Sequence, residues 1–319
     1  MKRFWPHLCI CLGLLLVPSI SWAQLDLPGS GPTLSVEPRV PAPGATYTVR
    51  LNDFSSAGGG TIDWFVDGEP ASGVQNLRAI SLPAGNIGEE TTITVRSTSV
   101  DGGVLQTTTT VTPAALAIIV EADTSVPQWY QGRAMPSIGS PVIITAIPND
   151  GSGDAPADYT YTWRFNNDVA NAGATAGQFQ NTFTMPLGRF ATVRVTVTDS
   201  DGTLVAERSI GIPPQAPELH FYEISALRGV SPLSIGANYN LIGSEVSIKA
   251  EPFYMTNNAA TAQLREWSVN GRTIENPNTD QTTITLQNGG GRGSFAVNFH
   301  IRNLQELLQG VEAGFNVRF

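Results

Sequence analysis

Short runs in which hydrophobic and polar residues alternate recur along most of the chain. In residues 159–165 (YTYTWRF) an aromatic residue stands at every second position, and residues 191–197 (ATVRVTV) alternate in the same way with alanine and valine. A period of two is typical of a strand with one face in a core, whereas an amphipathic helix repeats every 3.6 residues. Turn pairs such as Asp201-Gly202 and Asn270-Gly271 separate the runs. The pattern predicts an all-β, antiparallel fold.

A tryptophan-bearing strand occurs three times, as DWFVDGEP, TWRFNNDV and EWSVNGRT. Its tryptophans, Trp64, Trp163 and Trp267, lie 99 and 104 residues apart. Each is preceded by a turn with an alternating strand and followed by a further set of strands in the same order, which makes the repeat secure. Because the alternation places each indole on the apolar face, we expect these tryptophans to be structural core residues.

The N-terminus has the organisation of a secretory signal peptide. Lys2 and Arg3 precede an apolar stretch, and Ser21-Trp22-Ala23 offers small residues at the positions that determine cleavage. The apolar stretch is shorter than the roughly 20 residues that span a bilayer, so cleavage after Ala23 is favoured over retention as an anchor. Both cysteines, Cys9 and Cys11, lie in this leader, and the processed chain is expected to have neither disulfides nor sulfur-bound metal.

The size of each repeat, about 80 to 105 residues, matches an immunoglobulin-like (Ig-like) β-sandwich. The sequence therefore predicts three tandem Ig-like antiparallel β-sandwiches behind the leader, joined by short proline-marked linkers. The predicted division is a signal peptide over residues 1–23, an N-terminal linker over 24–32, and sandwiches over 33–113, 114–213 and 214–319.

The middle repeat resembles a known family. Residues 161–165 (YTWRF) and 193–202 (VRVTVTDSDG) resemble the aromatic strand and the penultimate hairpin of PKD-type Ig-like domains, although Asn166, Asn167 and Asp168 stand where that family usually has Gly-Asp-Gly. The resemblance implies an extracellular spacer or adhesive module, often found in tandem in exported bacterial proteins.

Charge and reactive groups narrow the classes of function. Without Lys2 and Arg3, 16 basic residues of the original 18 stand against 27 acidic ones, a formal charge of −11, which disfavours nucleic-acid binding. The processed chain keeps His220 and His300, one lysine and no Gly-x-Ser-x-Gly motif, so no nucleophile with its base is apparent. We expect no enzyme activity and no cofactor. A glycoside-active enzyme is the remote alternative, since two carboxylates would suffice.

Residues 126–139 (VPQWYQGRAMPSIG) interrupt the alternation of the middle repeat. Trp129, Tyr130, Arg133 and Met135 in this insert are of the types enriched at interface centres. The insert either folds back to cap the edge of its own sandwich or forms a binding surface for a protein or glycan. These four residues are the candidate binding site.

Two further stretches allow a specific expectation. Asp199 and Asp201 have a spacing found around calcium, but without the remaining ligands of an EF-hand a turn in which aspartates bond their own backbone is favoured. Near the C-terminus, Asn303 is expected to start a short helical turn over residues 303–310. The alternation of Phe315, Val317 and Phe319 then predicts a final strand.

These observations predict an exported, non-catalytic protein of the cell surface, periplasm or extracellular space, acting as an extended structural and adhesive module. Its partner would be an envelope or surface protein or a glycan, without insertion of the processed chain into the membrane. The alternative is a carbohydrate-binding protein that uses exposed aromatic residues of the 126–139 insert.

Export should remove residues 1–23, so that the native protein begins at Gln24. Intact-mass measurement of the protein from its source would locate the N-terminus, and added reductant should leave its melting temperature unchanged because no cysteine remains. A native chain that retains Met1 to Ala23 would favour the membrane-anchored alternative.

Overall fold

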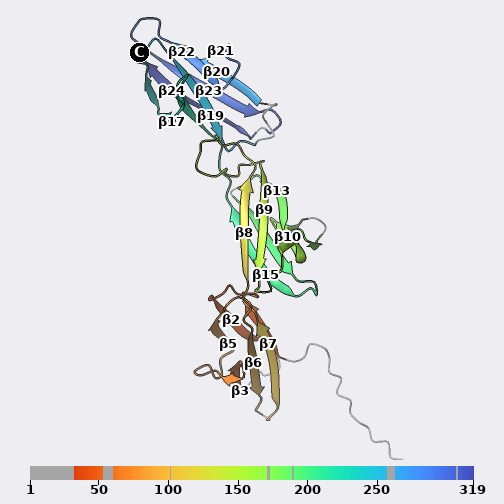
Figure 1. Ribbon diagram of the computed structural model, residues 1–319. Helices are drawn as coiled ribbons and strands as arrows, with labels where there is room; N and C mark the ends of the chain where they lie inside the picture. Colours follow the sequence, from red (N-terminus) through yellow and green to blue (C-terminus); the bar gives the residue numbers. More distant parts are fainter. Residues whose placement is uncertain are drawn as a thin grey trace, which may run out of the picture.

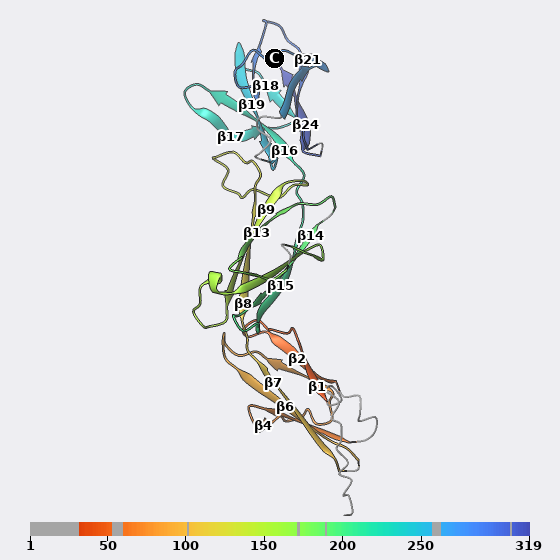
Figure 2. The same ribbon diagram turned by 90° about the vertical axis from the view of Figure 1, so that its right-hand side faces the viewer.

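The computed structural model forms three β-sandwiches arranged end to end (Figure 1), and the turned view shows the same elongated order (Figure 2). The predicted fold class, tandem Ig-like antiparallel β-sandwiches, is confirmed. Among the described residues there is no helix with the length and hydrophobicity needed to cross a membrane. The structure describes residues 32–52, 60–100, 102–170, 173–188, 190–256, 263–306 and 308–319.

The first sandwich has sheets in the strand orders β1-β2-β5 and β4-β3-β6-β7. Along β2, Tyr47, Val49 and Leu51 are buried and the residues between them are more exposed, as the alternation predicts. The strands are β1 (Thr33–Glu37), β2 (Thr46–Asn52), β3 (Thr61–Val66), β4 (Glu69–Pro70), β5 (Ala79–Pro83), β6 (Thr91–Thr98) and β7 (Val104–Val111).

The second sandwich has sheets in the orders β13-β9-β8 and β11-β10-β14-β15, with β12 beside β10. Tyr161 and Trp163 of β10 are buried between the sheets, with ring centroids 6.4 Å apart. Its elements are β8 (Ala115–Ala122), β9 (Pro141–Asn149), the 3-10 helix η1 (Pro156–Asp158), β10 (Thr160–Phe165), β11 (Asp168–Val169), β12 (Thr175–Ala176), β13 (Gln180–Thr184), β14 (Ala191–Thr198) and β15 (Leu204–Ile212).

The third sandwich has sheets in the orders β17-β16-β19-β22 and β18-β24-β23-β20-β21, in which β18 joins β24 in parallel. Its core contains Trp267, Phe299 and Phe315. The strands are β16 (Glu218–Ser225), β17 (Gly229–Ile235), β18 (Asn238–Asn240), β19 (Glu245–Phe253), β20 (Gln263–Val269), β21 (Arg272–Ile274), β22 (Thr283–Gln287), β23 (Ser294–Asn303) and β24 (Gly310–Arg318).

Each repeated tryptophan is buried and hydrogen-bonded in the same way. The exposed fractions of Trp64, Trp163 and Trp267 are 2%, 1% and 1%. Their indole N–H groups donate to backbone carbonyls of the segment that passes from one sheet to the other. The acceptors are Leu77 (2.8 Å), Gln178 (2.9 Å) and Gln281 (3.0 Å). A buried indole needs such an acceptor, so each ring fixes both the core and the inter-sheet connection.

The turn after each tryptophan strand is also repeated. Asp67, Asn166 and Asn270 have φ of 51°, 49° and 48°, a left-handed conformation that Asp and Asn tolerate better than most residues. Each side chain accepts a hydrogen bond from the backbone N–H of the neighbouring strand, at Thr92 (2.7 Å), Thr192 (2.9 Å) and Ala296 (3.0 Å). Asn166-Asn167 thus makes the same clamp as Asp67-Gly68, so the middle repeat keeps this turn without a glycine at its second position.

The helical turn predicted to start at Asn303 is wrong for the described part of that segment. Asn303 ends β23, and its side chain accepts the N–H of Gln305 (2.9 Å) in a local turn. Its own N–H donates to the carbonyl of Gln309 (2.7 Å), which closes the connection to β24. Asparagine competes for nearby backbone groups in this way outside helices. The terminal strand occurs as β24, paired with β23.

Replacement of Trp163 by alanine should lower the free energy of unfolding by about 3–5 kcal/mol, because it leaves a cavity and a carbonyl without its donor. Phe190→Ala is the matched control, since this ring in the same sandwich is 61% exposed and exposed substitutions usually change stability by about 0.5 kcal/mol or less. Urea unfolding measures both. Equal, small losses would contradict the core role of Trp163.

Candidate functional site

The insert of residues 126–139 leaves the end of β8 and contacts the third sandwich. Just before it, Thr124 forms a β-bridge with Thr256. Ser125 donates its N–H to Met255 O (2.6 Å) and accepts the N–H of Tyr254 (2.7 Å). Tyr254 has φ of 63°, which is unusual for a bulky residue and stays in place only when its surroundings determine it. The insert therefore belongs to a junction between two sandwiches.

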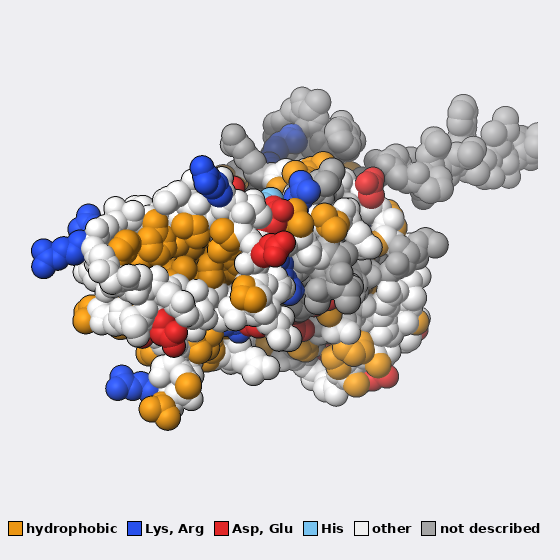
Figure 3. Space-filling model, turned by 90° about the horizontal axis from the view of Figure 1, so that it is seen from above, with side chains coloured by type: hydrophobic (Ala, Val, Ile, Leu, Met, Phe, Trp, Pro, Cys, Tyr) orange, Lys and Arg blue, Asp and Glu red, His pale blue; other side chains and the backbone are white. Residues whose placement is uncertain are grey.

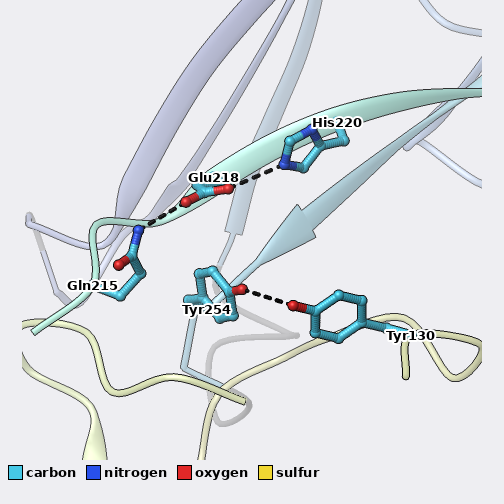
Figure 4. Close-up of polar contacts among 5 residues, drawn as sticks. All are labelled: Tyr130, Gln215, Glu218, His220 and Tyr254. Atoms are coloured by element: carbon cyan, nitrogen blue, oxygen red, sulfur yellow. Dashed lines mark hydrogen bonds and ion pairs between the residues drawn. The ribbon is translucent and has the colours of Figure 1, made fainter. Parts of the chain in front are cut away.

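Aromatic rings from both sides meet at this junction. The rings of Trp129 and Tyr222 lie 4.9 Å apart edge to face, and those of Tyr130 and Phe253 lie 5.2 Å apart at 90°. Edge-to-face pairs of this kind stabilise by about 0.5–1.5 kcal/mol beyond their buried area. The Tyr130 and Tyr254 hydroxyls are 3.3 Å apart (Figure 4). This hydrogen bond, together with burial, raises the pKa of Tyr254 to about 12.

The four candidate residues divide into two groups. Tyr130 and Met135 are half-buried against the cluster of Tyr222, Phe253 and Tyr254, and the Met135 carbonyl accepts the Thr124 hydroxyl (2.8 Å). Trp129 keeps 42% of its surface exposed while its edge contacts Tyr222. Arg133 is exposed beside a hollow of about 130 Å³ that is also lined by Val120, Met135, Ile212 and Pro213. The structure thus brings three of the four to the junction and leaves Trp129 and Arg133 accessible.

A fully buried glutamine ties the two sandwiches together. The side-chain amide of Gln309 donates to the Ser137 hydroxyl (2.7 Å) and the Ile138 carbonyl (2.5 Å), and its oxygen accepts the N–H of Thr256 (3.1 Å). Gln309 and Ser137 are both 0% exposed. A buried amide without these partners would have a large desolvation cost, so the network favours one relative placement of the two sandwiches.

The linker between the sandwiches is also held. Gln215 donates its N–H to the Pro136 carbonyl (2.6 Å), and its side chain donates to Glu218 (2.8 Å), whose other oxygen lies 3.1 Å from Nε2 of His220 (Figure 4). The proline-marked linker between these two sandwiches, residues 213–217 (PPQAP), is therefore anchored to the insert. His220 is a strand-face residue of β16 beside the ring of Phe253.

The loop that contains Asp199 and Asp201 is organised by its own backbone. The Asp199 carboxylate accepts the N–H groups of Asp201 (2.9 Å) and Thr203 (2.8 Å). This is the geometry of the turn interpretation. Within the described part of the chain there is no group of at least three His, Cys, Asp or Glu side chains arranged to hold a metal ion.

The sequence pattern did not indicate the partners of the insert on the third sandwich. Tyr130 and Tyr254 are 124 residues apart, and Gln309 lies in a polar stretch that was expected to be a helical turn. One signal was present: Phe253 and Tyr254 are adjacent aromatic residues at the end of β19, where strict alternation would expose one of them. Such a pair indicates contacts on both sides of the strand end.

Comparisons with known proteins supply structural likenesses only. No protein-family model and no curated protein matches the sequence. Fibronectin(III)-like modules of CbhA from Clostridium thermocellum have 11% identity and a TM-score of 0.27, with 57% of this chain and 94% of that chain covered. For the central fibronectin-III array of RIM-binding protein the values are 13%, 0.28, 90% and 95%.

A third similar structure is SGBP-B of the Bacteroides ovatus mixed-linkage glucan utilization locus, in complex with a mixed-linkage heptasaccharide. It has 14% identity and a TM-score of 0.22, with 87% of this chain and 64% of that chain covered. At these identities and TM-scores the likenesses carry no functional information about this chain.

Replacement of Gln309 by leucine should loosen the junction, because Ser137, Ile138 and Thr256 lose their partner in a buried place. We expect a loss of about 1–3 kcal/mol in unfolding free energy. In small-angle X-ray scattering, the wild-type chain should give a radius of gyration above the roughly 19 Å of a compact domain of this length. The distribution of interatomic distances from the variant should be broader than that of the wild type. Gln305→Leu, at an exposed position of the same connection, is the control. An unchanged melt and profile for Gln309→Leu would contradict the role of the network.

Proposed function

We propose that this chain is an exported, non-catalytic envelope or cell-surface protein whose sandwiches form an extended arm for structural contacts and adhesion. In this proposal the signal peptide covers residues 1–23, a linker covers 24–32, and the sandwiches cover 33–113, 114–213 and 214–319, the middle one of PKD type. The end-to-end arrangement of the sandwiches carries the proposal (Figure 1).

The two junctions support a defined length for this arm. At the first, Gly88 donates its N–H to Pro113 (3.0 Å) and Ala114 donates to Pro41 (3.2 Å). Gly88 has φ of 75°, and an added Cβ there would meet the Asp150 carbonyl at 2.7 Å, so only glycine allows the close approach of these loops. At the second, the insert and Gln309 hold the sandwiches. An arm fixed at both junctions keeps its two ends at a set separation.

A carbohydrate-binding role is the second candidate, and Trp129 is the observation that favours it. Its indole is 42% exposed while one edge is held against Tyr222, so the ring is oriented without being covered. Arg133 in the same insert is exposed and could donate to sugar hydroxyls. A sugar ring stacks on an exposed, oriented aromatic face through its apolar side, which makes this end of the insert suitable for a glycan.

The processed chain should co-sediment with envelope preparations from its source, and the bound fraction should fall when unlabelled chain competes. Trp129→Ala separates the two candidates. Under the glycan proposal, binding to envelope polysaccharide should weaken at least about tenfold, as expected for the loss of an interface aromatic, whereas Trp129→Phe should retain part of it. Glycan binding that is unaffected by Trp129→Ala would exclude this site, and failure of the wild-type chain to bind envelopes would contradict the adhesive role.

A further inference from the structure

Strand β22 forms one edge of its sheet within the described part of the chain, next to β19. The backbone carbonyl of Thr282 accepts the N–H of Ala250, and the N–H of Asn288 donates to Ser244, so even-numbered residues bond toward β19. Backbone groups alternate in direction along a strand. The N–H and C=O groups of Thr285 and Gln287 therefore point away from the sheet, where an added strand could bond them.

One half of this edge is already covered. The side-chain amides of Asn276 and Asn278 both donate to the Thr283 carbonyl at 2.8 Å. They come from the segment that crosses from β21 to β22, the same segment that accepts the indole N–H of Trp267. The open part is consequently the short stretch from Thr285 to Gln287, at the end of the sandwich far from the junction.

An apolar groove of about 360 Å³ runs beside this open edge. Figure 3 looks onto this end of the molecule and shows hydrophobic side chains gathered in an elongated band. The groove is large enough for two aliphatic side chains. Its apolar walls are formed by Val269, Ile274, Pro277, Ile284, Leu286 and Phe295.

The groove reflects a loss of aromatic volume relative to the second sandwich and a shift of it relative to the first. In the second sandwich, Phe165 and Phe183 stack at 4.7 Å across the equivalent space. In the third sandwich, Val269 takes the place of Phe165, two residues after the tryptophan, and Leu286 of the edge strand β22 takes the place of Phe183. The first sandwich places the buried Tyr47 where the third has Val246. Phe295 stands where the other two sandwiches have Ala191 and Thr91, and the room for an added side chain lies between it and the smaller Val246, Val269 and Leu286.

The N-terminal segment of the chain has the composition to occupy this groove. In residues 24–27 (QLDL), Leu25 and Leu27 alternate with polar residues, and the two prolines and two glycines of the sequence at 28–32 (PGSGP) disfavour continuation of a strand. Two leucines at alternate positions present their side chains on one face of a strand. This segment precedes β1 and lies outside the described residues.

The N-terminal segment joins β1 at the end of the molecule opposite the groove, so it cannot reach the groove of its own chain. Thr33 pairs with Asn52, whereas the loop after β1 reaches the first junction through Pro41. The chain thus enters at the far end of the first sandwich. Nine residues extend at most about 32 Å, roughly the length of one sandwich built on a nine-residue strand, and three sandwiches separate the ends. Only a second copy can supply its groove.

We propose that residues 24–27 of one molecule add as a short strand to the Thr285–Gln287 edge of β22 in the next, with Leu25 and Leu27 in the apolar groove. Backbone bonds would supply affinity and the groove would select the alternating leucines, as in other cases of strand addition. Since the two surfaces differ and lie at opposite ends, the contact is heterologous and joins molecules head to tail in a line.

Sedimentation velocity of the chain beginning at Gln24 tests this self-association. The wild-type chain should form species heavier than a monomer that increase with concentration, and both deletion of residues 24–27 and the double change Leu25→Ser, Leu27→Ser should leave the monomer. The assay contains no envelope, so its outcome is independent of the adhesive proposal. A wild-type chain that stays monomeric, or a deletion variant that still assembles, would overturn the inference.

Thr285→Pro tests the acceptor edge, because it removes an outward N–H while the backbone bonds to β19 remain. It also removes the hydrogen bond between the Thr285 and Ser247 hydroxyls (3.0 Å); Thr285→Ala, which loses the same bond, is therefore its control. A peptide of residues 24–32 should bind the deletion variant, and at least about tenfold more weakly when both leucines are serine. This peptide measurement stands even if Thr285→Pro unfolds the sandwich. Equal binding of the wild-type and the double-serine peptide, or assembly by a folded Thr285→Pro chain, would show that the contact does not use this edge and groove and would overturn the proposal.

Discussion

The bond between a buried indole and the segment that crosses between the sheets is the constraint on which each sandwich depends. An Ig-like sandwich of this kind has two sheets and, among the described residues, no covalent link between them, since both cysteines, Cys9 and Cys11, precede the described residues. The indole fills the space between the sheets while its N–H holds the crossing backbone at 2.8–3.0 Å. One side chain thus stabilises through burial and also fixes the path of the chain, because leaving either partner without the other would bury an unpaired polar group.

The same crossing segment determines which backbone groups of the following edge strand are covered and which are left exposed. In the third sandwich it positions Asn276 and Asn278 over the Thr283 carbonyl, while the backbone N–H and C=O of Thr285 point away from the sheet, where the proposed strand would bond them. In the second sandwich, stacked Phe165 and Phe183 close the equivalent space. Three copies of one architecture therefore differ in side-chain volume at a few positions, while the tryptophan bond remains common to them.

Much of the fold could be predicted from the sequence because its causes are local. Alternation in residues 159–165 reports which face of β10 is buried, and the three tryptophan strands report the repeat. The candidate site was only half predictable. The unusual composition of residues 126–139 indicated a contact, but its partner depends on Phe253 and Tyr254, which no local period connects to it. Asn303 was predicted to start a helix because an asparagine side chain bonds nearby backbone N–H groups both at the start of a helix and in a turn. Only the burial of Gln309 decides between the helix and the turn.

The two junctions differ in the kind of interaction that holds them, and this decides where the arm would bend first. The second junction has a buried amide with three partners, two edge-to-face aromatic pairs and a strained Tyr254, all of which must be lost together if the sandwiches separate. The first is held by backbone bonds and by close loop packing at Gly88, beside a hollow of about 540 Å³ lined by Pro38, Val40 and Ala114. Backbone bonds near solvent exchange with water at little net cost, whereas a buried polar network does not. Under load the first junction should therefore yield before the second, and the groove at the far end should then move together with the insert that carries Trp129.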